Sequence, residues 1–231
     1  MKFVIISQAR AGSSLLGEML NSHSTIQCDG ELFNEHTLKK KWGKIGQWFA
    51  MEFPYVVVWM HERKTRKKHY GFKLLLSQAK QPEQFIDALL RKGYIVINLT
   101  RENVLDKAFS AAVAYTTGHW YINRAEKRQQ GPITLSPDLL LTRLAHTEKQ
   151  NKLQEALLKN RAHIPVCYEL DLADNEKQEA FSVRICEALQ VAAEPLHARC
   201  IKTDERSLSE RIANYDELIE TIKKSRYAAY V

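Results

Sequence analysis

The chain has 231 residues, of which 45% are apolar and 26% are charged, a balance typical of one globular α/β domain with a full-sized core. Lysine and arginine exceed aspartate and glutamate by 34 − 27 = 7, so the surface favours anionic partners such as nucleotides, nucleic acid or acidic glycans, with solubility alone as the alternative role of the charge. No apolar stretch approaches the length of a membrane span, the first apolar run is too short for a signal peptide, and the four cysteines lack metal-ligand spacing. We therefore expect a cytoplasmic protein with reduced thiols, no metal and no stable membrane insertion.

The first thirty residues predict a strand, a tight turn and a helix. The apolar run 3–6 leads into Gln8-Ala9-Arg10-Ala11-Gly12-Ser13-Ser14, and apolar residues follow at helical spacing. Glycine allows a close approach of the backbone, and the first N–H groups of a helix lack intrahelical partners, so this turn suits a phosphate or sulfate. Arg10 and the two serine hydroxyls would add hydrogen bonds. A plain N-cap and turn is the alternative, and the lysine of a Walker loop is missing after Gly12.

The next elements alternate between helices and strands. We expect a helix from 36 to about 53 that Pro54 ends, and a solvated basic loop over 61–69, with an electrostatic lure for an acidic ligand as the alternative. A strand is expected at 70–76, a helix at 82–91 and a buried strand at 94–99.

The second half continues this alternation. We expect the following elements: a helix at 103–116, a polar loop at 121–135, a long helix at 137–159, a strand at 164–168, and helices at 175–190 and 208–224. The alternation predicts a central parallel sheet flanked by helices in a single domain over residues 1–231. Arg10, Arg101 and Glu169 each follow a strand, where ligands of such sheets bind, so we expect them to converge.

Several short stretches in chain order resemble sulfotransferases that use 3′-phosphoadenosine-5′-phosphosulfate (PAPS). They are Arg10 to Ser14, Gly30-Glu31-Leu32-Phe33, Tyr70-Gly71-Phe72-Lys73-Leu74, Arg101 with Ser110, Val166-Cys167-Tyr168-Glu169-Leu170, and Arg211-Ile212-Ala213-Asn214-Tyr215. Thr116-Thr117-Gly118-His119-Trp120 looks like the bacterial carbohydrate branch that includes trehalose sulfotransferase. The resemblance spans residues 3 to about 215 and implies a three-layer, P-loop-like α/β fold.

The chain departs from the family pattern in two places. The usual Arg-Asp-Pro is Arg101-Glu102-Asn103 here, and no Arg-Lys-Gly segment is present near the C-terminus. Lys202 and Arg206 are candidates for the missing contacts to the 3′-phosphate.

The resemblance implies a role for each matching residue. The 5′-phosphosulfate would be held by Arg10, Ala11, Gly12, Ser13, Ser14 and Leu15. Lys73 would lie near the bridging oxygen, and Arg101 and Ser110 would hold the 3′-phosphate that remains in the product, 3′,5′-adenosine bisphosphate (PAP). Tyr168 would contact adenine. Each of these residues has a structural alternative. Lys73 would be a structural lysine, Arg101 a surface cation beside a neutral helix residue, Ser110, and Tyr168 a core tyrosine.

Glu31 matches the catalytic glutamate of trehalose sulfotransferase and is the candidate general base. In an anion-rich pocket we expect its pKa to be raised, which suits a base near neutrality. The alternatives are an acid in the first turn of the next helix, or His36 or His119 as the base. The acceptor would be a hydroxyl of a carbohydrate, glycolipid or other small molecule, bound by loops 34–69 and 119–137, which carry or adjoin four tryptophans.

Other functions remain open at this stage. A P-loop kinase of small molecules shares the architecture, although the chain lacks the Gly-Lys-Ser/Thr sequence. A non-catalytic nucleotide-binding protein of the same fold is a second alternative. A nucleic-acid binder ranks low, because the basic run has no interleaved aromatic residue. The oligomeric state stays open, with a homodimer among the alternatives.

Overall fold

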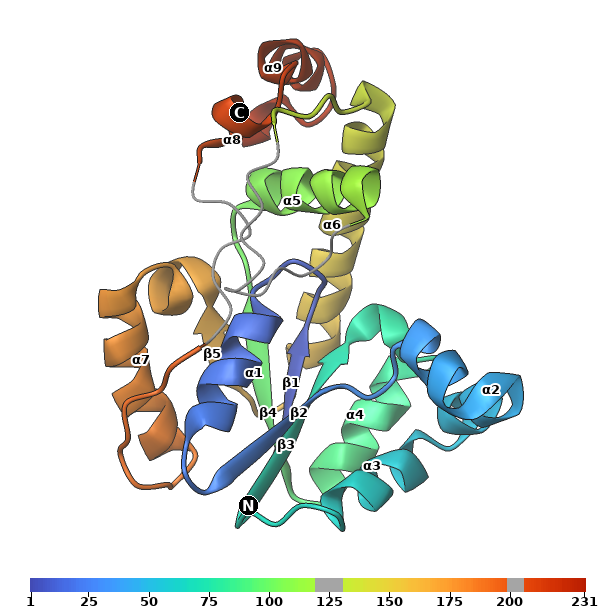
Figure 1. The fold of residues 1–231 in the computed structure, drawn as a ribbon, viewed down its shortest axis with the longest axis vertical. Coiled ribbons are helices and arrows are strands. Elements are labelled where there is room, and N and C mark those ends of the chain that lie inside the picture. The colour runs from blue at the N-terminus through green and yellow to red at the C-terminus, as the bar shows by residue number, and fades with distance from the viewer. Residues whose placement is uncertain (119–130, 199–205) are drawn as a thin grey trace. The chain divides into compact units, whose positions relative to one another are not determined.

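A computed structural model describes residues 1–118, 131–198 and 206–231 (Figure 1). These residues form two compact units. The sheet unit comprises Met1–Thr100 and Gln154–Ala198, and the helical unit comprises the described parts of Arg101–Leu153 and Arg199–Val231. The single domain expected over residues 1–231 stays a prediction.

The sheet unit contains a five-stranded, all-parallel sheet with the order β2-β3-β1-β4-β5. Its strands are β1 (Lys2–Ser7), β2 (Ile26–Glu31), β3 (His69–Leu75), β4 (Tyr94–Thr100) and β5 (Ile164–Cys167). The apolar run at the start of the chain is the central strand, between β3 and β4. The predicted parallel α/β sheet is confirmed.

Helices cover both faces of this sheet (Figure 1). They are α1 (Ser13–Ser22), α2 (Glu35–Glu52), α3 (Pro54–Glu62), α4 (Pro82–Arg91) and α7 (Asn175–Ala188), with short helical turns η1 (Leu76–Gln78) and η3 (Tyr168–Leu172). The end of α6 (Pro137–Leu158) also belongs to this unit.

The alternation of side chains along β1 explains the three layers. Phe3 and Ile5 are fully buried in a cluster with α1 and α7, whereas Val4 and Ile6 are fully buried in a second cluster with α2, α3 and α4. Successive side chains of a strand point to opposite faces, so one continuous apolar run supplies both cores.

The segment between β2 and β3 differs from the sequence prediction. Pro54 does not simply end a helix, because it starts α3 at a first-turn position, where its missing N–H has no intrahelical partner to lose. Residues 34–69 are therefore mostly helical, and the basic run 61–69 begins on α3 and ends on β3. Helix α2 is itself interrupted at Gly43, whose φ of 68° is not helical.

The helical unit contains α5 (Val104–Thr117), most of α6, α8 (Leu208–Arg211), α9 (Tyr215–Lys223) and the short turn η4 (Ala228–Tyr230). The predicted helix 208–224 is wrong as one element, because it is broken between α8 and α9. There Ile212 forms a parallel bridge with Ile133, and the Asn214 amide donates to the Leu135 carbonyl at 3.0 Å and accepts from its N–H at 3.1 Å. Asn214 thus joins two distant segments of this unit.

Candidate active site

The turn between β1 and α1 has the backbone of an anion-binding loop. Gly12 is the residue before the helix and adopts a left-handed φ of 94°, and no side chain caps the helix. The N–H groups of the first turn therefore point outward at the positive end of the helix dipole. The N-cap alternative for the serines is wrong, because Ser13 and Ser14 are inside the helix.

Arg10 also has a left-handed backbone, with φ of 64°. This conformation costs a residue other than glycine about 1–2 kcal/mol. Strain of this kind at an arginine just past the carboxyl end of the central strand is consistent with a functional turn.

Tyr168 closes one side of this turn. A Cβ atom added to Gly12 would lie 2.6 Å from Cδ2 of the Tyr168 ring, so only glycine fits between the helix start and this side chain. Tyr168 is half-buried and packs against the cluster of α1 and α7. Part of its surface is thus structural, as the core-tyrosine alternative proposed, and part remains accessible beside the loop.

Lys73 links the turn to a carboxylate. Its side chain lies on β3, is 7% exposed, and its Nζ donates to Ser14 Oγ at 3.0 Å. The same Nζ lies 3.3 Å from Glu31 Oε1 in an ion pair. A buried lysine is normally paired with other polar groups. Lys73 is paired with Ser14, a candidate ligand of the phosphosulfate, and with Glu31, the candidate base.

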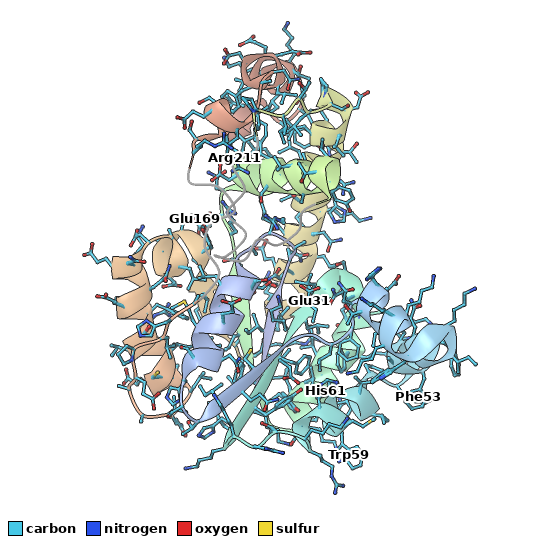
Figure 2. All side chains as sticks on the ribbon, in the orientation of Figure 1. Glu31, Phe53, Trp59, His61, Glu169 and Arg211 are labelled. Carbon is cyan, nitrogen blue, oxygen red and sulfur yellow. The ribbon has the colours of Figure 1, made fainter. Side chains whose placement is uncertain are left out.

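An irregularity in β2 brings Glu31 to Lys73. Asp29 is the register partner of Phe72 and Glu31 that of Lys73, so Gly30 is an extra residue, a β-bulge. Glu31 is the last residue of β2, at its carboxyl end (Figure 2), which excludes the helix-acid alternative.

The pKa of Glu31 is lowered, not raised as expected. Burial raises it, but the charge of Lys73 and hydrogen bonds to the carboxylate outweigh that effect. Gln78 Nε2 donates to Glu31 Oε2 at 2.7 Å, and Asn34 Nδ2 donates to the same oxygen at 3.2 Å. The sequence expectation failed because Lys73 and Gln78 come from a segment distant in the chain. Asn34 and Gln78 were missed, although each lies just past a strand end, which is the signal that pointed to Arg10, Arg101 and Glu169.

A second polar cluster lies on the opposite face of β2. His61 Nδ1 lies 2.9 Å from Asp29 Oδ2, and the Tyr70 hydroxyl donates to the same oxygen at 3.1 Å. Burial raises the pKa of Asp29, but these bonds and one from Gln27 hold it below its usual value. The cluster ties α3 to the sheet, and no sequence pattern indicated it.

The other predicted residues have different surroundings. Arg101 and Ser110 belong to the helical unit, where the guanidinium of Arg101 pairs with Asp106 at 3.2 Å. His36 is exposed on α2 and makes none of the contacts of the Ser14–Lys73–Glu31 cluster. His119, Trp120 and Lys202 lie outside the described residues. Whether Arg10, Arg101 and Glu169 converge stays a prediction.

The described part of the chain has neither a metal-binding cluster nor a candidate membrane span. No group of three or more His, Cys, Asp or Glu side chains is placed to hold a metal ion there. Within residues 1–118, 131–198 and 206–231, no helix combines the length and apolar character needed to span a bilayer.

The sheet order and the turn define an α/β protein with a P-loop-like fold. A crystal structure of a sulfotransferase from Alicyclobacillus acidocaldarius aligns with a TM-score of 0.54 and 15% identity, over 99% of this chain and 92% of that one. In sequence, the chain is 30% identical over 143 residues to Nodulation protein H of Rhizobium tropici. That match covers 58% of this chain and 54% of the relative, so the chain spans about half the length of the curated relative it matches.

A shikimate kinase from Bacteroides thetaiotaomicron aligns less well, with a TM-score of 0.49 and 12% identity over 83% of this chain and 99% of that one. No protein-family profile matches the chain. The resemblance to sulfotransferases that the motifs indicated is confirmed by the matches to the Alicyclobacillus structure and to Nodulation protein H.

Proposed function

We propose that the protein is a sulfotransferase that moves a sulfuryl group from PAPS to a hydroxyl of a carbohydrate, glycolipid or other small acceptor, and releases PAP. The observation that carries this proposal is the hydrogen-bonded series Ser14–Lys73–Glu31 beside the turn of Gly12. It combines an anion site, a cation and a carboxylate in one cluster. The likeness to Nodulation protein H and to a sulfotransferase fold supports it.

The groups around the turn suit a sulfate joined to a phosphate. Arg10, Lys73, the hydroxyls of Ser13 and Ser14, and the N–H groups up to Leu15 are all donors or cations, which is the chemistry that binds an oxyanion. PAPS supplies the activated sulfuryl group when bound. By resemblance, Arg101 and Ser110 hold the 3′-phosphate and Tyr168 contacts adenine.

Glu31 is the proposed general base. In the transfer, the acceptor oxygen forms a bond to sulfur, the bond between sulfur and the phosphate oxygen breaks, and the acceptor proton goes to Glu31. Lys73 stabilises the negative charge that develops on the leaving phosphate oxygen. Positive charge fixed in a partly buried site is more effective than in water, because it is less screened.

Calorimetric titration of PAP, ADP and ATP without magnesium tests this proposal. We expect PAP to bind most tightly, and Lys73→Met and Arg101→Ala to weaken it about 10–100-fold, the loss expected for a charge-assisted hydrogen bond. Lys177→Met, an equivalent change on α7, is the control and should bind PAP like the parent.

Other outcomes support the alternative functions. Magnesium-dependent ATP binding tighter than PAP binding would favour a P-loop kinase. PAP binding without any transfer from PAPS would indicate a non-catalytic nucleotide-binding protein. If no nucleotide binds, the turn at Arg10 has only a structural role and the proposal fails.

We further propose that the two units act as one domain and that the protein works in the cytoplasm. We expect it to need no metal ion and to bind no nucleic acid. The cytoplasmic location is supported by Cys28 and Cys186, which are buried thiols outside any disulfide.

A further inference from the structure

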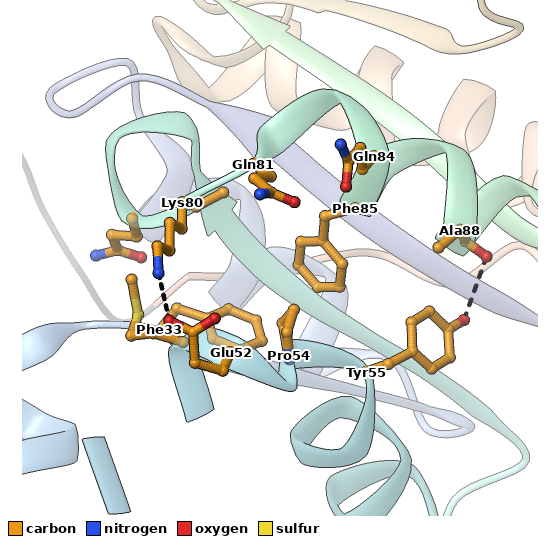
Figure 3. A pocket seen from close by; sticks show the side chains of 12 residues that line it. Phe33, Glu52, Pro54, Tyr55, Lys80, Gln81, Gln84, Phe85 and Ala88 are labelled. Atoms are coloured by element: carbon orange, nitrogen blue, oxygen red, sulfur yellow. Dashed lines mark hydrogen bonds and ion pairs between the residues drawn. The ribbon is translucent and has the colours of Figure 1, made fainter. Parts of the chain in front are cut away.

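A cavity of about 210 Å³ lies between the start of α3 and the segment that joins η1 to α4 (Figure 3). Phe33, from the connection after β2, contributes to its wall. All of its lining residues belong to the sheet unit. The functions assigned above do not use this cavity.

The wall of the cavity combines aromatic rings with amides. Phe33, Tyr55 and Phe85 supply the rings, and Gln78, Gln81 and Gln84 supply the amides. Rings with a few convergent polar groups are typical of small-molecule sites, and amides can both donate to and accept from hydroxyl groups.

The charges of the wall are paired with each other. Lys80 forms an ion pair with Glu52 at one end of the cavity, and at the other end the Tyr55 hydroxyl donates to the Ala88 carbonyl at 3.4 Å (Figure 3). With its lysine and glutamate neutralised, the cavity favours an uncharged ligand, because a charged ligand would lose hydration without gaining an opposite charge.

Gln78 connects the cavity to the candidate base. Its Nε2 donates to Glu31 Oε2 at 2.7 Å, whereas its Oε1 is buried and has no hydrogen-bond partner among the described residues. A residue of the cavity wall is therefore in direct contact with the candidate base.

We infer that this cavity binds an uncharged sugar ring of the acceptor, with ring hydroxyls on the amides of Gln81 and Gln84 and the ring against Phe85 and Tyr55. The inference rests on the proposed function. Glu31 is not part of the cavity wall, and the cavity is smaller than the pockets of roughly 300–1,000 Å³ that hold drug-sized ligands. The bound ring is therefore the neighbour of the reacting one, and the acceptor has at least two linked units.

Saturation-transfer NMR with the neutral disaccharide trehalose, in the presence of PAP, tests the inference. We expect trehalose to bind more tightly than glucose, glucuronate or cyclohexanol. Gln81→Ala and Gln84→Ala remove exposed amides and should each weaken trehalose binding about fivefold, the effect of one hydrogen bond. Ala88→Met should fill the cavity and abolish binding. Asn175→Ala, which removes an exposed amide on α7, is the matched control and should bind trehalose like the parent.

PAP titration of the same samples separates the two proposals. The sugar subsite alone would be overturned if the parent protein binds PAP normally but does not bind trehalose. It would also be overturned if Ala88→Met and the parent protein bind trehalose equally. Preferred binding of glucuronate or cyclohexanol would also overturn it. Loss of PAP binding in the parent protein would instead contradict the proposed function.

Discussion

At the residue scale, Lys73 is shared between two groups with different tasks. Its Nζ contacts both Ser14 Oγ and the Glu31 carboxylate. In this arrangement the lysine stabilises the ionised form of Glu31, which makes the carboxylate a weak base. An anion bound at the turn would compete for the same ammonium group, so occupancy of the turn and the basicity of Glu31 are coupled.

This coupling predicts that PAP raises the pKa of Glu31. The 5′-phosphate adds negative charge near Lys73, and a like charge disfavours ionisation of a carboxyl group. Titration of protein labelled with ¹³C in its glutamate carboxyl groups, with Glu31→Gln to assign the signal, measures the pKa with and without PAP. An unchanged pKa in PAP-saturated protein would argue against a shared lysine.

Replacement of Glu31 by Gln should separate binding from turnover. The amide keeps the size of the side chain but cannot accept the acceptor proton, so we expect turnover to fall about 10²–10⁴-fold while PAP binding stays within a few-fold of the parent. PAP release from PAPS in the presence of trehalose gives the rate, and calorimetry gives the affinity. Glu35→Gln, an exposed change on α2, is the control. Full activity of Glu31→Gln would remove it from the mechanism.

At the scale of elements, the turn between β1 and α1 depends on one glycine for two reasons. Gly12 combines a φ of 94° with a close approach to Tyr168. We expect Gly12→Ala to lower the free energy of unfolding by about 1–3 kcal/mol, measured by urea denaturation, since both the backbone and the ring must adjust.

Gly30→Ala is the matched comparison for this prediction. No atom lies within 4 Å of the added Cβ, and the backbone of Gly30 is not left-handed. This variant should unfold like the parent protein. Equal destabilisation by the two changes would mean that the Tyr168 contact and the left-handed backbone have no energetic weight.

Local sequence signals identified most of these elements. Helix α4 has the predicted bounds, Pro82–Arg91, because a proline fits its first turn and Gly93 follows its end in a left-handed conformation. Helix α2 ends just before Pro54 as predicted, but the start of α3 at the same proline was missed, because a first-turn proline and a helix-stopping proline look alike in sequence. The break before α9 depends on Ile133 and Leu135, which are distant in the chain.

The candidate site was predictable where its residues belong to recognisable motifs, and unpredictable where its electrostatics depend on packing. Ser14, Lys73 and Glu31 were all identified from motifs, and the structure brings them into contact. The lowered pKa of Glu31 requires the positions of Lys73, Gln78 and Asn34 around one carboxylate, which no spacing rule supplies.

At the scale of the whole molecule, the net charge of +7 predicts that salt distinguishes the two proposed ligands. Attraction of PAP to a cationic protein is screened over about 10 Å at 0.1 M salt and about 3 Å at 1 M, so its affinity should fall as salt rises. Trehalose carries no charge, and its affinity should stay nearly constant. Calorimetry and NMR titrations between low and high salt measure both. A PAP affinity that is independent of salt would contradict an electrostatic donor site.

The bulge at Gly30 means that β2 has two possible alignments on β3. In an unbroken alignment Gly30 would pair with Lys73, and Glu31 would pair with Leu74, whose side chain belongs to the apolar cluster of α2, α3 and α4. Burial of a carboxylate there is unfavourable, so the ion pair with Lys73 selects the bulged alignment as well as placing the base. Deletion of Gly30 should remove this choice, because the glutamate then reaches Lys73 in regular register. We expect this shortened chain to bind PAP like the parent and to unfold at no lower urea concentration. This result would show that the Lys73–Glu31 ion pair determines the alignment of β2 on β3.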